Sequence, residues 1–124
     1  MNKVIGIFLS LHEKTKRGEI KWEETENAKE FQVAFPTYSI RIGSQEGQYG
    51  LPVYYLKIFN QEGKLIEEIG QDELGAGVYP IGPGPGARMQ ELYELARRIA
   101  MRVEEALDSI LSELEGKVER GPKK

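Results

Sequence analysis

A chain of 124 residues is long enough to form one domain around a single buried core. Its residues are 40% hydrophobic and 30% charged with a formal net charge of −3, so the chain as a whole has no electrostatic attraction to nucleic acid or anionic membranes. The sequence contains no cysteine, which excludes disulfides, thiolate metal sites and cysteine nucleophiles. We expect one domain over residues 1–116 and a flexible tail over residues 117–124.

The first expected element is a helix that begins near Asn2, which can cap it, and ends at Gly18. Its apolar residues follow helical spacing: Val4, Ile5, Ile7, Phe8 and Leu11. Gly6 and Ser10 interrupt this apolar run, and no cleavage-like small-residue site follows it, so we predict neither a signal peptide nor a membrane span. We therefore expect a cytoplasmic protein.

The middle of the chain changes to the alternation that is typical of strands. Five strands are expected, around Ile20–Trp22, Phe31–Phe35, Tyr38–Ile42, Val53–Phe59 and Leu65–Ile69. Pro36 and Thr37 predict a tight connection, and "NQEGK" at residues 60–64 predicts a hairpin in which Gly63 adopts a positive φ. A loop of roughly 17 residues follows Gly70, a length typical of functional or mobile segments.

The last expected element is one long helix from about Ala87 to Glu115. Its apolar residues repeat at alternate spacings of three and four, as in a heptad seam: Met89, Leu92, Ala96, Ile99, Val103, Ala106 and Ile110. Leu107, Leu111 and Leu114 widen this stripe toward the end of the helix.

The order of helix, five strands and helix predicts an α+β fold, in which a five-stranded antiparallel meander is covered on one face by the helices. At roughly 1.5 Å per residue, the last helix would be longer than a typical strand, so part of it would extend beyond the sheet. The overhanging seam must be buried within the domain or by a second copy of the chain.

The segment "YPIGPGPGARM" has the loose spacing of a dinucleotide-binding fingerprint at Gly82, Gly84 and Ala87. Pro83 and Pro85 remove two backbone N–H donors, and no parallel βαβ unit surrounds the segment, so we interpret it as a stiff linker. Arg88 keeps an anion-binding alternative open. A small ligand bound beneath the Gly70–Gly86 loop is a further alternative, with contacts from Tyr79, Gly84 and Arg88.

No arrangement of residues predicts catalysis, a cofactor or a metal site. His12 is the only histidine, and we expect it to be a partly exposed helix residue. The serines lie in no nucleophile-elbow context, and acidic residues such as Glu23, Glu24 and Glu26 fit a solvated strand end.

Two local surfaces remain as candidates. A basic edge with a neighbouring aromatic ring could contact nucleic acid, although the same cations favour a helix end and the ring fits a core position: Lys14, Lys16, Arg17, Lys21 and Trp22. The last helix could bind a partner or a second copy of the chain through Leu92, Tyr93, Ala96, Ile99, Val103, Arg97, Arg98 and Arg102. The arginines fit equally well on a solvated face beside glutamates.

Three runs of the chain, "TKRGEIKWEE", "IFNQEGKLIEE" and "LYELARRIAMRVEEALDSILSEL", resemble a group of small, functionally uncharacterised bacterial proteins. The resemblance covers most of the chain and implies a bacterial cytoplasmic origin, but no activity or site. From the residues themselves we predict a non-enzymatic interaction or regulatory module that forms a homodimer through its long last helix, with nucleic-acid binding and small-ligand binding as the alternatives.

Overall fold

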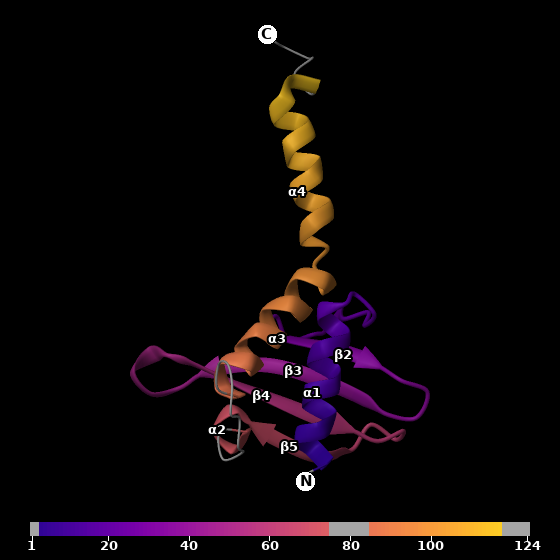
Figure 1. The fold of residues 1–124 in the computed structure, drawn as a ribbon, viewed down its shortest axis with the longest axis vertical. Helices are drawn as coiled ribbons and strands as arrows, with labels where there is room; N and C mark the ends of the chain where they lie inside the picture. Colours follow the sequence, from indigo (N-terminus) through magenta and orange to yellow (C-terminus); the bar gives the residue numbers. More distant parts are fainter. Residues whose placement is uncertain (1–2, 75–84, 118–124) are drawn as a thin grey trace.

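The computed structural model describes residues 3–74 and 85–117, which form helices and a sheet in two layers (Figure 1). The elements in chain order are α1 (Lys3–Lys16), β1 (Glu23–Glu24), β2 (Glu30–Ala34), β3 (Ser39–Glu46), η1 (Gln48–Gly50), β4 (Pro52–Phe59), β5 (Leu65–Gly70), α2 (Gln71–Leu74), α3 (Pro85–Ala100), α4 (Val103–Ser112) and η2 (Glu113–Lys117).

The sheet is an antiparallel meander in the order β1-β2-β3-β4-β5, which confirms the predicted α+β fold. Ile42 pairs with Phe31 on one side and with Leu56 on the other, so consecutive strands place apolar residues in register. The first strand begins later than predicted. Ile20 and Trp22 precede β1 and are buried, and only Glu23 and Glu24 pair with β2.

Both predicted turns form. Phe35 N donates to Tyr38 O at 2.7 Å across the β2–β3 connection. In the β4–β5 hairpin, Gly63 has a φ of 82°, and the side chain of Asn60 accepts hydrogen bonds from the backbone of Glu62 and Lys64. These bonds satisfy turn donors that the strands leave unpaired, which is why an asparagine with a glycine three residues later favours this turn.

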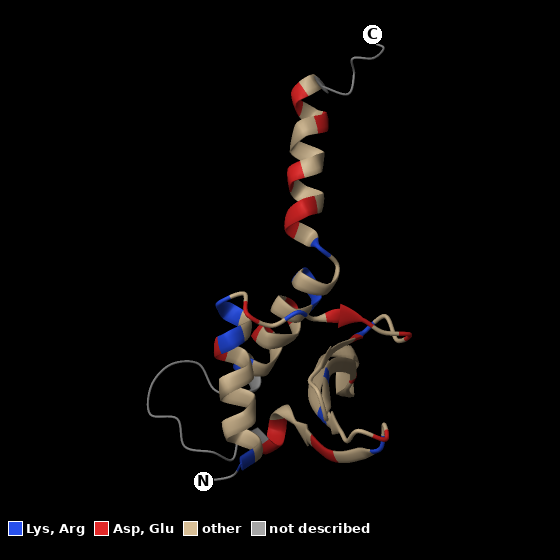
Figure 2. Ribbon diagram, turned by 90° about the vertical axis from the view of Figure 1, so that its right-hand side faces the viewer, with Lys and Arg blue, Asp and Glu red and all other residues tan. Residues whose placement is uncertain are grey.

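The core lies between one face of the sheet and the two helices α1 and α3, which Figure 2 shows on the same side of the sheet. Strand alternation supplies the lower layer, and the apolar stripes of the helices supply the upper layer. The side chains with almost no exposure are Phe8, Phe31, Ile42, Leu56, Met89 and Leu92.

The long helix predicted over residues 87–115 is not continuous. It is divided into α3 and α4 at Arg102, which has φ 54° and ψ 47° in the left-handed region. Such a backbone costs on the order of 1 kcal/mol for a residue with a Cβ, and no glycine or proline marks the position in the sequence. The heptad pattern continues through the break, so periodicity alone could not reveal it.

The break separates a helix that packs on the sheet from one that leaves it. α3 contacts α1 and the strands, whereas α4 extends away from the domain in both views and has no buried residue (Figures 1 and 2). Two ion pairs span the junction, one between Arg98 and Glu104 and one between Arg102 and Glu105. The predicted overhang of the last helix is therefore present as α4.

Candidate interaction site

An apolar groove runs between α1 and the sheet, on the part of the inner sheet face that α3 leaves uncovered. It has a volume of about 590 Å³. Its lining residues are Val4, Ile7, Ser10, Leu11, Lys14, Ile20, Phe35, Tyr38, Ile40, Ile58, Ile66 and Glu67. We call it the α1 groove.

The walls of the α1 groove expose large apolar side chains. Ile7 on α1 and Phe35 in the β2–β3 turn are each 40% exposed, and Tyr38 and Ile66 are about half exposed. These residues come from three separate parts of the chain and line one hollow, so the exposed apolar surface is contiguous. Contiguous apolar surface of this kind is typical of a binding site for another apolar surface.

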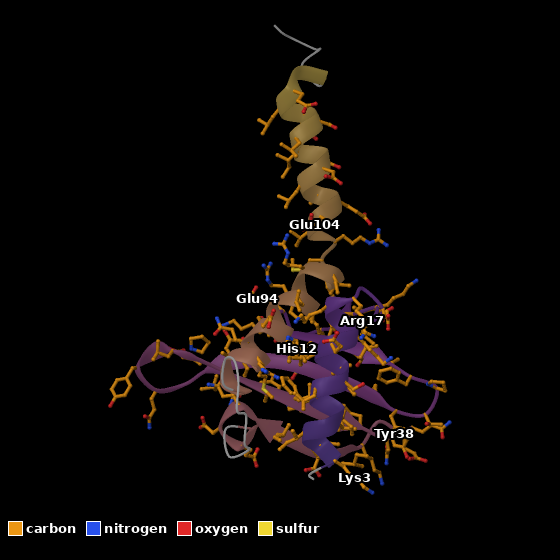
Figure 3. The ribbon with its side chains drawn as sticks, in the orientation of Figure 1. Lys3, His12, Arg17, Tyr38, Glu94 and Glu104 are labelled. Atoms are coloured by element: carbon orange, nitrogen blue, oxygen red, sulfur yellow. The ribbon has the colours of Figure 1, made fainter. Side chains whose placement is uncertain are left out.

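Cations border the groove on the α1 side. Lys3, Ile7, Ser10 and Lys14 follow one another at helical spacing and are all exposed. Arg17 lies one turn beyond Lys14, and Figure 3 shows Lys3 and Arg17 at opposite ends of α1. The outer edge of α1 is therefore apolar in its middle and basic toward both ends.

The helix α4 is amphipathic and has its apolar side uncovered. Leu107, Ile110 and Leu111 project within one side of the helix and are 43%, 48% and 56% exposed, and Leu114 follows one turn later at 76%. Glu104 and Asp108 flank this apolar stripe on one side. Figure 2 shows acidic residues recurring along α4.

The predicted partner surface is divided by this arrangement. Leu92 and Ala96 are fully buried, and Tyr93 is 8% exposed with its ring against Phe31 and Tyr54. These three residues face the domain's own sheet, so their assignment to a partner surface was wrong.

The remaining residues of that predicted surface lie at the end of α3 and at the junction with α4. Ile99 and Val103 are half-buried, and Arg102 is exposed. Arg97 donates to Glu94 on the same helix at 3.0 Å, and Arg98 donates to Glu104 on α4, so both arginines are already paired with glutamates of the same chain. The alternative interpretation of the arginines, as members of a charged helix surface, agrees with these contacts.

The aromatic residue of the predicted basic edge, Trp22, is buried in the core. Trp22 is only 3% exposed, and its Nε1–H donates to Thr15 Oγ1 at 3.0 Å. The ring is therefore covered and cannot stack on a base in this conformation. Lys14 pairs with Glu19 at 3.8 Å and Arg17 with Glu13 at 3.3 Å, while Lys16 and Lys21 are exposed.

The expected exposure of His12 was also wrong, because the residue is 7% exposed beneath α3. Its Nε2 lies 3.0 Å from Glu91 Oε1, and its ring stacks on Phe8. Burial lowers the pKa of His12 despite the neighbouring carboxylate, so a neutral ring donates its Nε2–H to Glu91. A polar cleft of about 530 Å³ is lined here by Leu9, His12, Glu13, Lys16, Arg88 and Glu91.

Of the three candidate ligand contacts, Arg88 is the one that the structure describes, and it is half-buried where it lines this cleft. Tyr79 and Gly84 lie outside the described residues, as do the glycine at 82 and most of the expected tail. The part of the expected loop directly after Gly70 forms the short helix α2.

The opposite face of the sheet carries a polar cluster that the sequence did not predict. Glu30, with a side chain only 6% exposed, accepts hydrogen bonds from Tyr55 Oη at 2.6 Å and Arg41 Nη1 at 3.1 Å. Lys57 Nζ lies 3.5 Å from the same carboxylate. Burial and the hydrogen bond to Glu30 raise the pKa of Tyr55, so its hydroxyl stays protonated.

This Glu30 cluster depends on register. Glu30, Gly43 and Tyr55 are consecutive partners across β2, β3 and β4, and the missing side chain of Gly43 leaves room for the Tyr55 ring. Arg41 also donates to Gln32 and Glu26, and the latter contact lowers the pKa of Glu26. These contacts pair opposite charges and donors with acceptors, which fits a role in holding the strands together.

The described residues offer no metal site and no membrane segment. Within residues 3–74 and 85–117, no group of three or more His, Cys, Asp or Glu side chains is arranged to hold a metal ion. No described helix is both long and apolar enough to cross a membrane. No protein-family model, curated protein or solved structure matches the chain, so the resemblance to small bacterial proteins stays a prediction.

Proposed function

We propose that this chain is a non-enzymatic protein-interaction module that self-associates through α4. One observation carries the proposal: α4 is amphipathic, yet its apolar residues lie outside the domain core. Leu107, Ile110 and Leu111 are each about half exposed on one side of a helix that has no buried residue. An apolar helix face in water is unfavourable, and a second surface that covers it would stabilise it.

The free energy gained by covering the apolar side of α4 indicates how much further apolar surface the partner must provide. Covering the exposed parts of Leu107, Ile110, Leu111 and Leu114 contributes on the order of 4 kcal/mol per chain. Association costs on the order of 4–15 kcal/mol in lost translational and rotational freedom and ordering. The apolar residues of α4 must therefore meet further apolar surface for a stable pair to form.

The basic edge supports nucleic-acid binding less well, since Trp22 is buried and donates to Thr15. The small-ligand alternative depends largely on residues outside the described ranges. Neither alternative explains an exposed apolar helix, whereas self-association does.

Absolute mass by multi-angle light scattering tests the proposal. The full chain is expected to have the mass of two chains at concentrations near 100 µM, an order of magnitude typical for a weak dimer. Leu111→Glu is expected to reduce it to one chain. The matched control is Leu51→Glu, which places the same charge at a 64% exposed leucine before β4. A single-chain mass for the unmodified protein at all accessible concentrations would contradict self-association.

A further inference from the structure

We infer that two copies of the chain exchange their α4 helices. The α4 of each copy lies in the α1 groove of the other. The inference rests on the proposed function and names the surface that receives the helix. Both halves of the contact are present on every chain: an uncovered apolar helix and an uncovered apolar groove. A reciprocal exchange uses each half once per chain, and the resulting pair is closed by two-fold symmetry.

The two surfaces match in length. The α1 residues that line the groove extend from Val4 to Lys14, which corresponds to about 15 Å of helix at 1.5 Å per residue. The ten residues of α4, Val103–Ser112, also span about 15 Å. A helix of this length can lie beside α1 with its apolar side toward Ile40 and Ile58 at the base of the groove.

The two surfaces also match in charge. On α4 and the turn after it, residues 103–117 carry five acidic side chains and one lysine. Glu104 and Asp108 lie on one flank of the apolar stripe. Lys14 lines the groove, and Lys3 lies one helical turn before the lining residue Ile7. The acidic flank would therefore lie along the basic edge of α1. The β5 side of the groove presents Ile66 and Glu67, which directs the acidic flank toward α1.

The same charges disfavour pairing of α4 with α4. Two copies of this helix in contact would bring their acidic flanks together, and like charges across an interface weaken it. Near the groove, by contrast, the ion pairs of the lining residue Lys14 with Glu19 and of Arg17 with Glu13 lie at the end of α1, with side chains about half exposed. Exposed pairs of this kind contribute little stability, so these cations can exchange partners at low cost.

The break at Arg102 explains why α4 is exposed to a second copy of the chain. Because Arg102 adopts the left-handed region, α4 departs from the line of α3 and from its own domain (Figure 1). A second copy can then receive a helix that the first copy holds in the open. The chain's own α4 would reach its own groove only if the backbone at Arg102 changed conformation.

Complementation between two variants tests the inference in the full chain. The helix variant carries Leu107→Glu and Leu111→Glu, and the groove variant carries Ile7→Glu and Ile66→Glu, all at positions at least 40% exposed. Each variant alone is expected to have the mass of one chain, with unchanged circular dichroism. An equimolar mixture is expected to recover a two-chain species, because the intact helix of one variant enters the intact groove of the other.

The masses of the single variants separate failure of the exchange from failure of self-association through α4. A groove variant that still forms dimers would overturn the exchange but leave self-association through α4 standing. If the helix variant still forms dimers, the proposed function itself is wrong, and the inference fails with it. A single-chain mass for the unmodified protein would overturn both the proposed function and the exchange. A chain whose α4 folded back into its own groove would give this same result.

Cross-linking supplies an independent readout, because the chain has no cysteine. Ser10 lies in the middle of the groove wall and Leu107 near the middle of α4, so Ser10→Cys with Leu107→Cys should form an interchain disulfide for either helix direction. The control pairs Leu51→Cys with Leu107→Cys and should give no link beyond that of Leu107→Cys alone. A strong disulfide between the Leu107→Cys positions of two chains would indicate that α4 pairs with α4 and would overturn the exchange.

Discussion

Leu92 and Leu111 both belong to the apolar pattern of the C-terminal helices, but only Leu92 is buried in the domain. Leu92 on α3 is fully buried, whereas Leu111 on α4 is 56% exposed. Truncating Leu92 to alanine removes apolar atoms worth about 2.4 kcal/mol in transfer free energy, and the cavity adds about 1 kcal/mol. We expect Leu92→Ala to lower the free energy of unfolding by about 3–4 kcal/mol and the thermal midpoint by on the order of 10–15 °C.

The same truncation at Leu111 should change the free energy of unfolding of the isolated chain by less than about 0.5 kcal/mol. Urea unfolding at low protein concentration, followed by circular dichroism, measures both variants under conditions where association contributes nothing. At high concentration the unmodified protein should gain stability by mass action, and Leu111→Ala should lose that gain. Equal losses for the two variants at low concentration would refute the division between a core helix and an interaction helix.

Three further predictions concern the sheet, the buried histidine and the helix break. Gly43→Ala should lower the free energy of unfolding by about 2–3 kcal/mol, because its Cβ would lie 2.6 Å from Glu30 Cγ and against the Tyr55 ring. Urea unfolding measures this loss, and an unchanged midpoint would contradict the close packing. For His12, the folded pKa lies below the unfolded value of 6.5, so the unfolded chain binds more protons between the two values and stability should fall as the pH drops below 6.5. The variant His12→Gln should show a flatter stability profile between about pH 5 and pH 7, where carboxylates titrate little; an identical profile would exclude His12 as the cause. Arg102→Gly should keep the helical circular dichroism signal, because glycine accepts the left-handed region, whereas glycine inside a continuous helix costs about 1 kcal/mol. A clear loss of helical signal would indicate that α3 and α4 are one helix in solution.

The candidate site could be predicted only in part. The sequence predicted that an apolar helix would extend beyond the sheet, because its apolar pattern is longer than a strand, and α4 is that helix. The α1 groove was not predicted. Ile7, Phe35 and Ile66 come from three separated segments, and no local pattern indicates that α3 leaves the sheet surface beneath them open.

The Glu30 cluster shows the same limit from the polar side. In the sequence Glu30 is one of 20 acidic residues, and nothing nearby marks it as buried. Its partners Arg41, Tyr55 and Lys57 reach it only because β2, β3 and β4 pair in one particular register. Side chains on neighbouring strands meet across the sheet, so their contacts depend on pairing that local periodicity does not encode.

By itself, the sequence determined the layers of this protein and most of its helices and strands. Alternation in the strands, helical spacing in α1 and α3, and the turn at Asn60–Lys64 are local properties that depend on backbone sterics and short-range hydrogen bonds. The tertiary structure decided which apolar residues are covered. Leu92 and Leu111 look alike in the sequence, and only the position of the sheet and the left-handed backbone at Arg102 separate the buried one from the exposed one.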